Sequence, residues 1–559
     1  MMKKKNIAKV LTVLLILATM FSMVGCGKKG EEGTTETKTE TTGTAETSKE
    51  GEKTAETKTL ADYDKVSTFK YFGMGSGVET EQLNNSPTAK LVKDHTGYDV
   101  YYDQAPADPV DAQTAITNIF MLKSDYQGVK VSKEQFYTLL EMDALLPITE
   151  YVNASTNLKE VITDFGWQTA TKDGEIYAIP QKNARLASNT AIAFRLDWLN
   201  EYNEANPDAQ IPVPSEENNY SMTLSDFKTM LTFFATKVPE GGKAMAVDVQ
   251  TVYQENILPA FGINVGSNSE WAEVDGKLEY AINQPGFEDY MKYMEDLFDS
   301  GLIQYQATAN DAGVAKSLQA RTVGAGRIPH WNAATIEATD ASPTDDNISY
   351  IQALVPDENK GDPNAVRVFA QQGYSYYTVI PKYSTPEQAA AVIDWADKKL
   401  DKDFFLEMVL GTEGDTYTVE NGEYYPILPT FDEKQGLADK FMDGIREEDY
   451  ANYWLCRTRK TEAQDKMFSI ANYNIDKTGI QNPITVMPPN SAYDTYYSAA
   501  NIEVKDTLVT TLFDKDKNLS LDEIKAVFNG LQGEEITSSV NEWYQTWELK
   551  DSFNTVKPR

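Results

Sequence analysis

Hydrophobic positions after residue 60 follow two periods, one typical of strands and one typical of helices. Residues 67–74 (STFKYFGM) alternate apolar and polar side chains and run into glycines, which predicts a strand that feeds a loop. Residues 287–300 instead carry Tyr290, Met294 and Leu297 at the spacing of a core-facing helix stripe. Further helices are predicted at 88–94, 386–400 and 521–531, and a further strand at 98–102. This alternation predicts α/β lobes.

The first 26 residues carry a short apolar run behind a basic start. Four lysines precede residues 10–23, an apolar stretch shorter than the ~20 residues that span a bilayer. The run ends in MVGC, which resembles the lipobox of bacterial lipoproteins, whose cysteine is diacylated and becomes the mature N-terminus. We therefore expect a lipoprotein signal peptide over residues 1–25 and lipid on Cys26. An ordinary secretory signal that contains a cysteine and a retained N-terminal anchor are the alternatives.

Residues 27–59 form a segment of different composition. They contain no aromatic residue and no Leu, Ile, Val or Met, and Thr, Glu, Lys and Gly recur throughout. Such a segment buries too little apolar surface to offset the entropy of ordering. We expect the lipidated Cys26 and a disordered linker over residues 26–59, and a folded region from Leu60.

Charge and rare residues restrict the function. Removal of residues 1–25 takes away four lysines and no acid, so the net charge of −34 becomes −38 in the mature chain. A surface this acidic opposes nucleic acid. His95 and His330 are the two histidines, and with Cys26 lipidated, Cys456 has no partner for a disulfide. A zinc site or a Cys/His nucleophile is therefore poorly supported, and we predict no catalytic residue, metal or cofactor. Cys456 is expected to be a buried, unreactive thiol.

Ordered sequence blocks between residues 96 and 426 resemble one family. The most specific is WQTATKDGEIYAIP (167–180) followed by FRLDWLNEY (194–202). The others are TGYDVYY (96–102), LLPITEYVN (145–153), WAEVDGKLEY (271–280) with LFDSGLI (297–303), and GTEGDTYTVENGEYYP (411–426). Together they resemble the extracellular solute-binding lipoproteins of ABC importers, in the large sugar-binding branch of family 1.

The resemblance implies an α/β, two-lobed, periplasmic-binding-protein-like type II fold with three passages of chain between the lobes. We expect the N-terminal lobe to comprise residues 60–185 and 375–428, and the C-terminal lobe residues 186–374 and 429–559. The expected passages lie near residues 182–193, 368–377 and 426–433. The implied function is to capture a carbohydrate, and specifically an oligosaccharide, in the cleft and deliver it to ABC permease subunits. The protein is expected to be a monomer at the extracytoplasmic face of the cell membrane, held by Cys26.

Candidate ligand residues come mainly from the same resemblance. Trp331 follows a glycine-rich, strand-like run (VGAGRIPHW), where the family places an aromatic residue that stacks on sugar; a packing tryptophan is the alternative. The remaining candidates follow predicted strands or lie in stretches that line the cleft in relatives: Met74, Gln181, Tyr253, Gln254, Tyr376, Tyr496 and Tyr497. We expect one of Tyr496 and Tyr497 to be core. Arg195 and Asp197, although charged, are interpreted as orienting the start of a helix.

Residues 514–523 (DKDKNLSLDE) alternate oxygen donors, which suggests a calcium loop. An EF-hand counted from Asp514 would need Gly and Glu where the chain has Leu519 and Lys525. Ser520 and Glu523 instead fit the capping box of a following helix. Residues 237–248, where some large relatives bind calcium, lack the donors. We therefore predict no metal.

Three other functions remain open on sequence alone. An exported glycoside hydrolase would need two carboxylates across a cleft, and 85 acidic residues single out no pair. A peptide-binding or other solute-binding lipoprotein could share the architecture. A sensor partner could bind sugar without feeding an importer.

Overall fold

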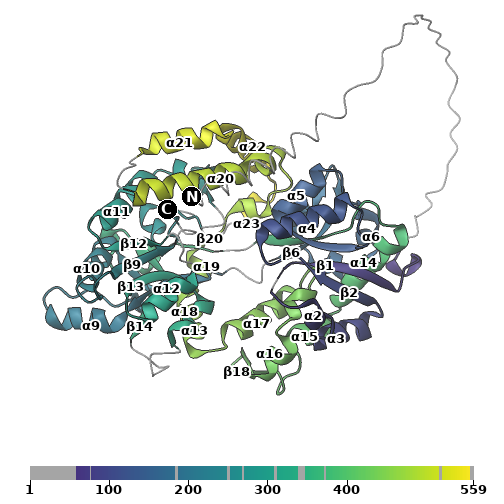
Figure 1. Ribbon diagram of the computed structural model, residues 1–559, viewed down its shortest axis with the longest axis horizontal. Coiled ribbons are helices and arrows are strands. Elements are labelled where there is room, and N and C mark those ends of the chain that lie inside the picture. The colour runs from purple at the N-terminus through teal and green to yellow at the C-terminus, as the bar shows by residue number, and fades with distance from the viewer. Residues whose placement is uncertain are drawn as a thin grey trace, which may run out of the picture. The chain divides into compact units, whose positions relative to one another are not determined.

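The computed structural model describes residues 58–75, 77–182, 187–248, 252–266, 270–306, 311–337, 347–370, 373–514 and 519–553. The chain divides into two units, Met1–Glu56 and Thr57–Arg559, and every described residue belongs to the second (Figure 1). The signal peptide, Cys26 and most of the predicted linker lie outside the described residues. Leu60 opens the first short helix, η1 (Leu60–Asp62), and is buried.

The first lobe is built on a five-stranded sheet. Its order is β2-β1-β3-β17-β6, with β1 parallel to β2 and β3, and β17 antiparallel to β3 and β6. The strands are β1 (Thr68–Gly73), β2 (Asp99–Gln104), β3 (Gly128–Ser132), β6 (Ala178–Lys182) and β17 (Tyr374–Val379). The two strands predicted at 67–74 and 98–102 are therefore confirmed as β1 and β2.

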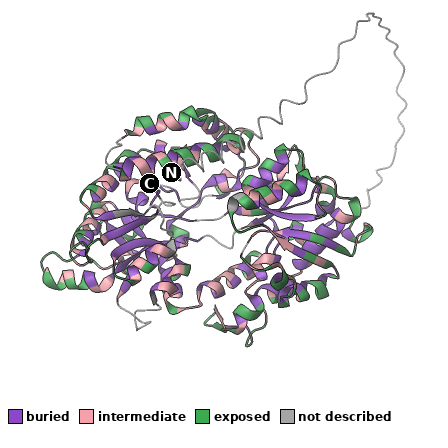
Figure 2. Cartoon of the chain, in the orientation of Figure 1, coloured by how far each residue is buried: buried purple, intermediate pink, exposed green. Residues whose placement is uncertain are grey.

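Helices cover both faces of this sheet because its side chains alternate. Phe69 in β1 packs on Trp395 of α14 (ring centroids 5.5 Å apart), whereas Phe72 belongs to the core on the opposite face. One face carries α3 (Pro87–Thr96), α14 (Pro386–Lys399) and α15 (Lys402–Leu410), and the other α4 (Pro109–Met121) and α5 (Lys133–Glu141). Strands β3 and β6 of the sheet are mostly buried, whereas the edge strand β2 and the outward helix faces are partly exposed (Figure 2).

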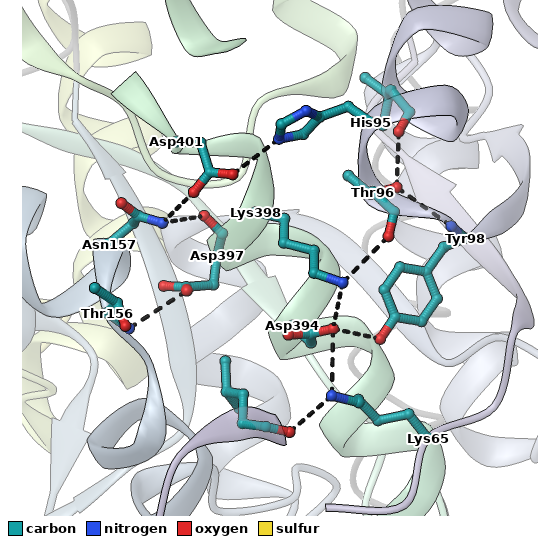
Figure 3. Close-up of polar contacts among 12 residues, drawn as sticks. Lys65, His95, Thr96, Tyr98, Thr156, Asn157, Asp394, Asp397, Lys398 and Asp401 are labelled. Carbon is teal, nitrogen blue, oxygen red and sulfur yellow. Dashed lines mark hydrogen bonds and ion pairs between the residues drawn. The ribbon is translucent and has the colours of Figure 1, made fainter. Parts of the chain in front are cut away.

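Acidic residues on α14 form hydrogen bonds and ion pairs with neighbouring segments (Figure 3). Asp397 accepts a hydrogen bond from the backbone N–H of Leu158 (2.8 Å) at the start of α7 (Asn157–Val161). Asp394 accepts one from the Tyr98 hydroxyl (2.6 Å) and pairs with Lys65 (3.5 Å), just after η1. These contacts join the beginning of the folded unit to the core of the first lobe.

The second lobe repeats the arrangement. Its sheet has the order β12-β9-β13-β7-β14, formed by β7 (Thr190–Arg195), β9 (Lys243–Asp248), β12 (Ile303–Gln306), β13 (Val323–Pro329) and β14 (Ile348–Ile351). When the strands of each lobe are counted in chain order, both sheets have the second strand at one edge, followed by the first and the third, with the fourth at the other edge. One additional strand, β17 in the first sheet and β7 in the second, lies antiparallel between the third and the fourth, and the chain enters it as it arrives from the other lobe. This shared order confirms the predicted two-lobed type II fold.

The helix predicted at residues 287–300 of the second lobe is confirmed. Helix α11 (Phe287–Asp299) buries Tyr290, Met294 and Leu297 completely, as the stripe predicts. The remaining helices of this lobe include α9 (Leu196–Ala205), α10 (Leu224–Phe234), α12 (Asp311–Gln319), α13 (Ala333–Glu337) and α18 (Glu462–Ala471). Within the described ranges, no helix combines the length and apolar character needed to cross a bilayer.

Two of the three predicted passages agree with the structure, and the third differs. The chain passes from β6 to β7 and from β16 (Val368–Phe369) to β17 within the predicted ranges; residues 183–186 and 371–372 of these ranges lie outside the described residues. After the hairpin β18 (Tyr417–Glu420) and β19 (Glu423–Pro426), the chain stays in the first lobe.

The third passage instead follows α17 (Glu447–Thr458), where the chain continues into α18 of the second lobe. Phe431 of α16 (Thr430–Gln435) and Tyr453 and Cys456 of α17 are fully buried in the core of the first lobe. The predicted division at residue 429 and the passage at 426–433 are therefore corrected. Burial of these apolar side chains keeps residues 430–458 with the first sheet.

The C-terminal helices are α20 (Ser491–Phe513), α21 (Leu521–Gly530), α22 (Gly533–Thr546) and α23 (Lys550–Phe553). Helices α20, α21 and α22 pack on the hairpin β10 (Trp271–Val274) and β11 (Lys277–Tyr280) of the second lobe, whereas Phe553 of α23 packs on Phe165 (ring centroids 5.6 Å apart). The segment before α20 also reaches the first lobe, where the Tyr137 hydroxyl donates to the Met487 carbonyl (3.0 Å). Ser520 and Glu523 form the predicted capping box of α21; residues 515–518 of the discarded calcium loop lie outside the described residues.

Candidate ligand-binding site

A pocket of about 140 Å³ lies at the carboxyl ends of β1 and β2. In α/β sheets, ligands bind in the crevice outside the carboxyl ends of the strands. The loop after β1 can pass here because Gly75 has no side chain: a Cβ atom would lie 2.4 Å from the Pro106 carbonyl oxygen and 2.5 Å from that of Ala105. The polar and aromatic lining comes from Tyr71, Tyr102, Asp103, Gln104, Lys130, Gln181, Tyr376, Asp439, Lys440 and Tyr450.

Three of the predicted ligand residues meet in this pocket, namely Met74, Gln181 and Tyr376. Gln181 is 5% exposed, and its Oε1 atom accepts no hydrogen bond from the described part of the chain. Tyr376 is 39% exposed, and the Lys130 ammonium lies 5.7 Å from the centre of its ring. The pocket therefore offers an aromatic face beside a polar side chain with unfilled hydrogen-bonding capacity.

Charged side chains of both signs line the pocket. Asp439 pairs with Lys440 (2.9 Å) and with Arg457 (3.4 Å). Burial raises the pKa of Asp439, but these two cations more than offset it and hold the pKa below its usual range, so Asp439 is a carboxylate at neutral pH. Its Oδ1 atom is buried and accepts no hydrogen bond among the described residues.

Beneath the pocket lies a buried ionic cluster. Lys130 donates to the Met442 carbonyl (2.6 Å), and Lys399 pairs with Asp443. Burial lowers the pKa of Lys399 to about 8 and also lowers that of Lys130, although the Asp443 carboxylate opposes both effects. The Tyr71 hydroxyl donates to Asp443 (2.6 Å). This cluster fixes the floor of the pocket and the position of Lys130.

An aromatic row leads from the pocket to Trp331; we define it as Tyr450, Trp454, His330 and Trp331. Tyr450 and Trp454 are four residues apart on α17 and so lie on one face of the helix. The His330 ring centre is 6.3 Å from that of Trp454 and 5.0 Å from that of Trp331. Because α17 belongs to the first lobe and His330 directly follows β13 of the second, the row joins the two lobes.

The last two members of the row differ in exposure. Trp331 is 51% exposed, which is unusual for so large an apolar side chain and leaves its ring available to a ligand. His330 is buried, and burial lowers its pKa to about 4, so the imidazole is neutral at physiological pH. The row therefore ends in an exposed indole supported by an uncharged ring.

The other predicted ligand residues lie elsewhere. Tyr253 is fully buried with its hydroxyl 3.3 Å from that of Tyr280, and Gln254 beside it is 2% exposed. Tyr497 is buried and donates to Glu270, as expected if one of the two adjacent tyrosines is core. These three side chains pack inside the second lobe, so they have little surface to offer a ligand in this conformation.

Tyr496 and the charged pair complete the predicted set. Tyr496 is 37% exposed and lines a separate shallow groove between α20 and α22, away from the lining of the strand-end pocket. Arg195 is completely buried and holds Asp197 through two hydrogen bonds of 2.8 Å at the start of α9. This geometry agrees with the predicted structural role of the pair.

Sequence reasoning missed Lys130, Asp439, Lys440, Tyr450 and Trp454. Lys130 lies in a buried strand (GVKVS), where alternation gives no sign that one position faces a pocket. The other four fall in residues 439–454, which the predicted division places in the second lobe. The aromatic run YANYW (450–454) was the available signal, and correct placement of the third passage would have brought it to the pocket.

Two lobes with the same strand order and a polar, aromatic pocket at the strand ends define the fold of the two-lobed solute-binding proteins. No family model matches the sequence. Solved structures do match over most of the chain, and because their sequence identities are low they show the fold alone.

One match is the "HMO binding ABC-transporter associated Solute Binding Protein" of Bifidobacterium longum infantis, with a TM-score of 0.59, 13% identity, and coverage of 86% of this chain and 98% of that one. Another is the ABC-transporter substrate-binding protein FusA of S. pneumoniae in complex with kestose, with a TM-score of 0.61, 13% identity, and coverage of 86% and 99%. The alginate-binding protein AlgQ2 matches with a TM-score of 0.59, 15% identity, and coverage of 88% and 100%.

A protein of Niallia circulans described as "Uncharacterized protein in butB 5'region" is 25% identical over 260 residues, which are 46% of this chain and 98% of that protein. It supplies no function.

Proposed function

We propose that this protein is the substrate-binding component of an ABC importer and that it captures an oligosaccharide between its lobes. The observation that carries the proposal is the aromatic row, which joins the strand-end pocket of the first lobe to the exposed Trp331 of the second. Sugar rings have apolar faces and polar edges, so an aromatic face beside unfilled acceptors suits them. The matched structures named for milk oligosaccharides, kestose and alginate support this class of ligand.

Ligand binding would act on the angle between the lobes. A saccharide that contacts Tyr376 in the first lobe and Trp331 in the second would be bound most tightly in the arrangement where both contacts form. It would therefore shift the population toward that arrangement. A membrane permease that recognises the liganded arrangement would then receive the solute.

The proposal includes export and anchoring. The apolar run before Cys26 and the polar segment after it support a cleaved lipoprotein signal, a lipid on Cys26 and a flexible tether. A tethered binder stays at high local concentration beside its permease, here proposed as a monomer at the extracytoplasmic face of the cell membrane. Mass spectrometry of Cys26 from membrane fractions would test this part; an unacylated mature N-terminus would contradict it.

The ligand proposal is tested by calorimetry with a panel of oligosaccharides, with dipeptides and tripeptides in parallel. We expect binding of at least one oligosaccharide, and Trp331→Ala should weaken it roughly 30-fold, as for loss of an aromatic anchor of about 2 kcal/mol. Tyr101→Ala is the matched control, because Tyr101 is equally exposed (49%) on β2 but is absent from the pocket lining. Peptide binding without sugar binding, or hydrolysis of a labelled oligosaccharide, would refute the proposal.

A further inference from the structure

We infer that the strand-end pocket selects a neutral sugar ring over a ring that carries a carboxylate. The inference rests on the proposed function and concerns the class of sugar. The matched structures include proteins named for a neutral sugar, kestose, and for alginate, so the comparisons leave the charge of the ligand open. The preference for a neutral or a charged sugar is therefore inferred from the residues that line the pocket.

The first argument is the balance of charge. Two lysines and two aspartates line the pocket, and both ammonium groups already have partners. Lys440 pairs with Asp439 at 2.9 Å, and Lys130 donates to the Met442 carbonyl and lies over the Tyr376 ring. A carboxylate ligand would have to compete with these partners, and it would meet Asp439 and Asp103 at close range.

The second argument is the kind of hydrogen bond that the pocket lacks. Among the residues that the structure describes, the two buried lining atoms without a hydrogen-bond partner are the Gln181 Oε1 and Asp439 Oδ1 atoms, and both are acceptors. A buried acceptor without a donor is costly, so a ligand that supplies donors to both is favoured. Sugar hydroxyls donate, whereas an ionised carboxylate offers acceptors alone. A uronate ring keeps its other hydroxyls but has lost the 6-hydroxyl donor, so a neutral ring offers one more donor to these two acceptors than the matching uronate ring does.

The volume of the pocket limits the selection between neutral and charged sugars to one ring of the ligand. The pocket of about 140 Å³ is small beside the roughly 300–1,000 Å³ of typical ligand sites, so it holds one end of an oligosaccharide. The exposed face of Tyr376 would pack against that ring, with Asp439 and Gln181 at its hydroxyl edge. The remaining rings would follow the aromatic row toward Trp331.

The test compares neutral four-ring oligosaccharides with their own charged forms. Malto-, cello-, manno- and galacto-tetraose are measured by calorimetry at pH 7 before and after oxidation of the 6-hydroxyls to carboxylates, which changes charge and leaves linkage intact. We expect the oxidised form of any bound sugar to bind at least tenfold more weakly. Equal or tighter binding of an oxidised form would overturn the inference and leave the proposed function standing. Binding of neither form of any sugar would count against the proposed function itself, and the inference would fall with it.

Two variants assign the selectivity to the lining. Asp439→Asn removes a negative charge and leaves Lys440 without its partner, so the preference for the neutral form should fall at least threefold. Lys440→Gln leaves Asp439 less neutralised and should raise that preference. Asp415→Asn is the matched control, because Asp415 pairs with Lys434 (2.5 Å) on the surface, with about half of each side chain exposed. An unchanged preference in both pocket variants would overturn the inference.

Discussion

Asp443 is the residue on which the floor of the pocket depends, and we predict that Asp443→Asn will be strongly destabilising. Its side chain is 1% exposed and pairs with that of Lys399, which is equally buried. Asp443 also accepts hydrogen bonds from the Tyr71 and Thr378 hydroxyls. The asparagine keeps the size and some hydrogen bonds of the aspartate, but it leaves the Lys399 ammonium buried without its counter-charge.

The magnitude follows from burial. Removing one partner of a buried ion pair costs about 3–5 kcal/mol, whereas an exposed pair contributes about 0–1 kcal/mol. The loss should depend on pH. Burial already lowers the pKa of Lys399 to about 8, and without Asp443 that pKa falls further, so the folded variant can shed the proton. Since the unfolded chain keeps it up to a pKa of about 10.4, the variant regains stability as the pH rises from 6 to 9.

The assay is urea unfolding followed by tryptophan fluorescence, at pH 6 and at pH 9. Asp143→Asn is the control, because Asp143 pairs with Lys382 where the two side chains are 82% and 51% exposed. The reasoning would be refuted if Asp443→Asn cost no more than this control at pH 6, or if its loss grew as the pH rose. A second variant, Asp443→Asn with Lys399→Met, should recover part of the loss because the unpaired charge is gone.

Three further predictions concern the row, the loop after β1 and the buried thiol. Burial lowers the pKa of His330 to about 4 in the folded protein, against an ordinary value near 6.5. The free energy of unfolding should therefore fall as the pH drops from 6.5 to 4. In unfolding curves measured across this range, His330→Gln should reduce that fall by at most about 3 kcal/mol. Gly75→Ala should lower the melting temperature and cost about 1–3 kcal/mol because its Cβ would overlap the Pro106 carbonyl, whereas Gly73→Ala meets ordinary contacts from 3.6 Å and should cost less. Burial raises the pKa of Cys456 to about 12, so maleimide should label it only after denaturation, read by mass spectrometry of its peptide; rapid native labelling would contradict the burial.

The sequence predicted the parts of the fold that local periodicity governs. Tyr290, Met294 and Leu297 face one core because their spacing follows the helix turn, and the helix ends where Gly301 adopts a positive φ. The third passage could not be found this way. The apolar side chain of Phe431 could be buried in the core of either lobe, and only the tertiary contacts show that it belongs to the first.

The candidate site was predicted where a residue follows a strand and missed where it depends on distant packing. Gln181 lies at the end of a predictable strand, so its place at the strand-end pocket could be anticipated. Asp439 lies in a short 3-10 helix that reaches the same pocket from elsewhere in the chain. Tyr253 and Trp331 show the limit most clearly: both are aromatic residues in stretches that resemble relatives, yet one is fully buried and the other is half exposed.

The corrected passage also changes how the two lobes are coupled. Helix α17 carries Tyr450 at the pocket and Trp454 in the aromatic row, and it leads directly into α18 of the second lobe. Arg459 lies at this junction, donating to the Tyr424 carbonyl of the first lobe (2.9 Å) and to Asp465 of α18 (3.2 Å). The helix that carries two members of the aromatic row is thus also the helix that leads into the third passage. On the proposed function, a ligand that orders the side chains of α17 would act beside the third passage, so it could bias the arrangement of the lobes through this helix directly.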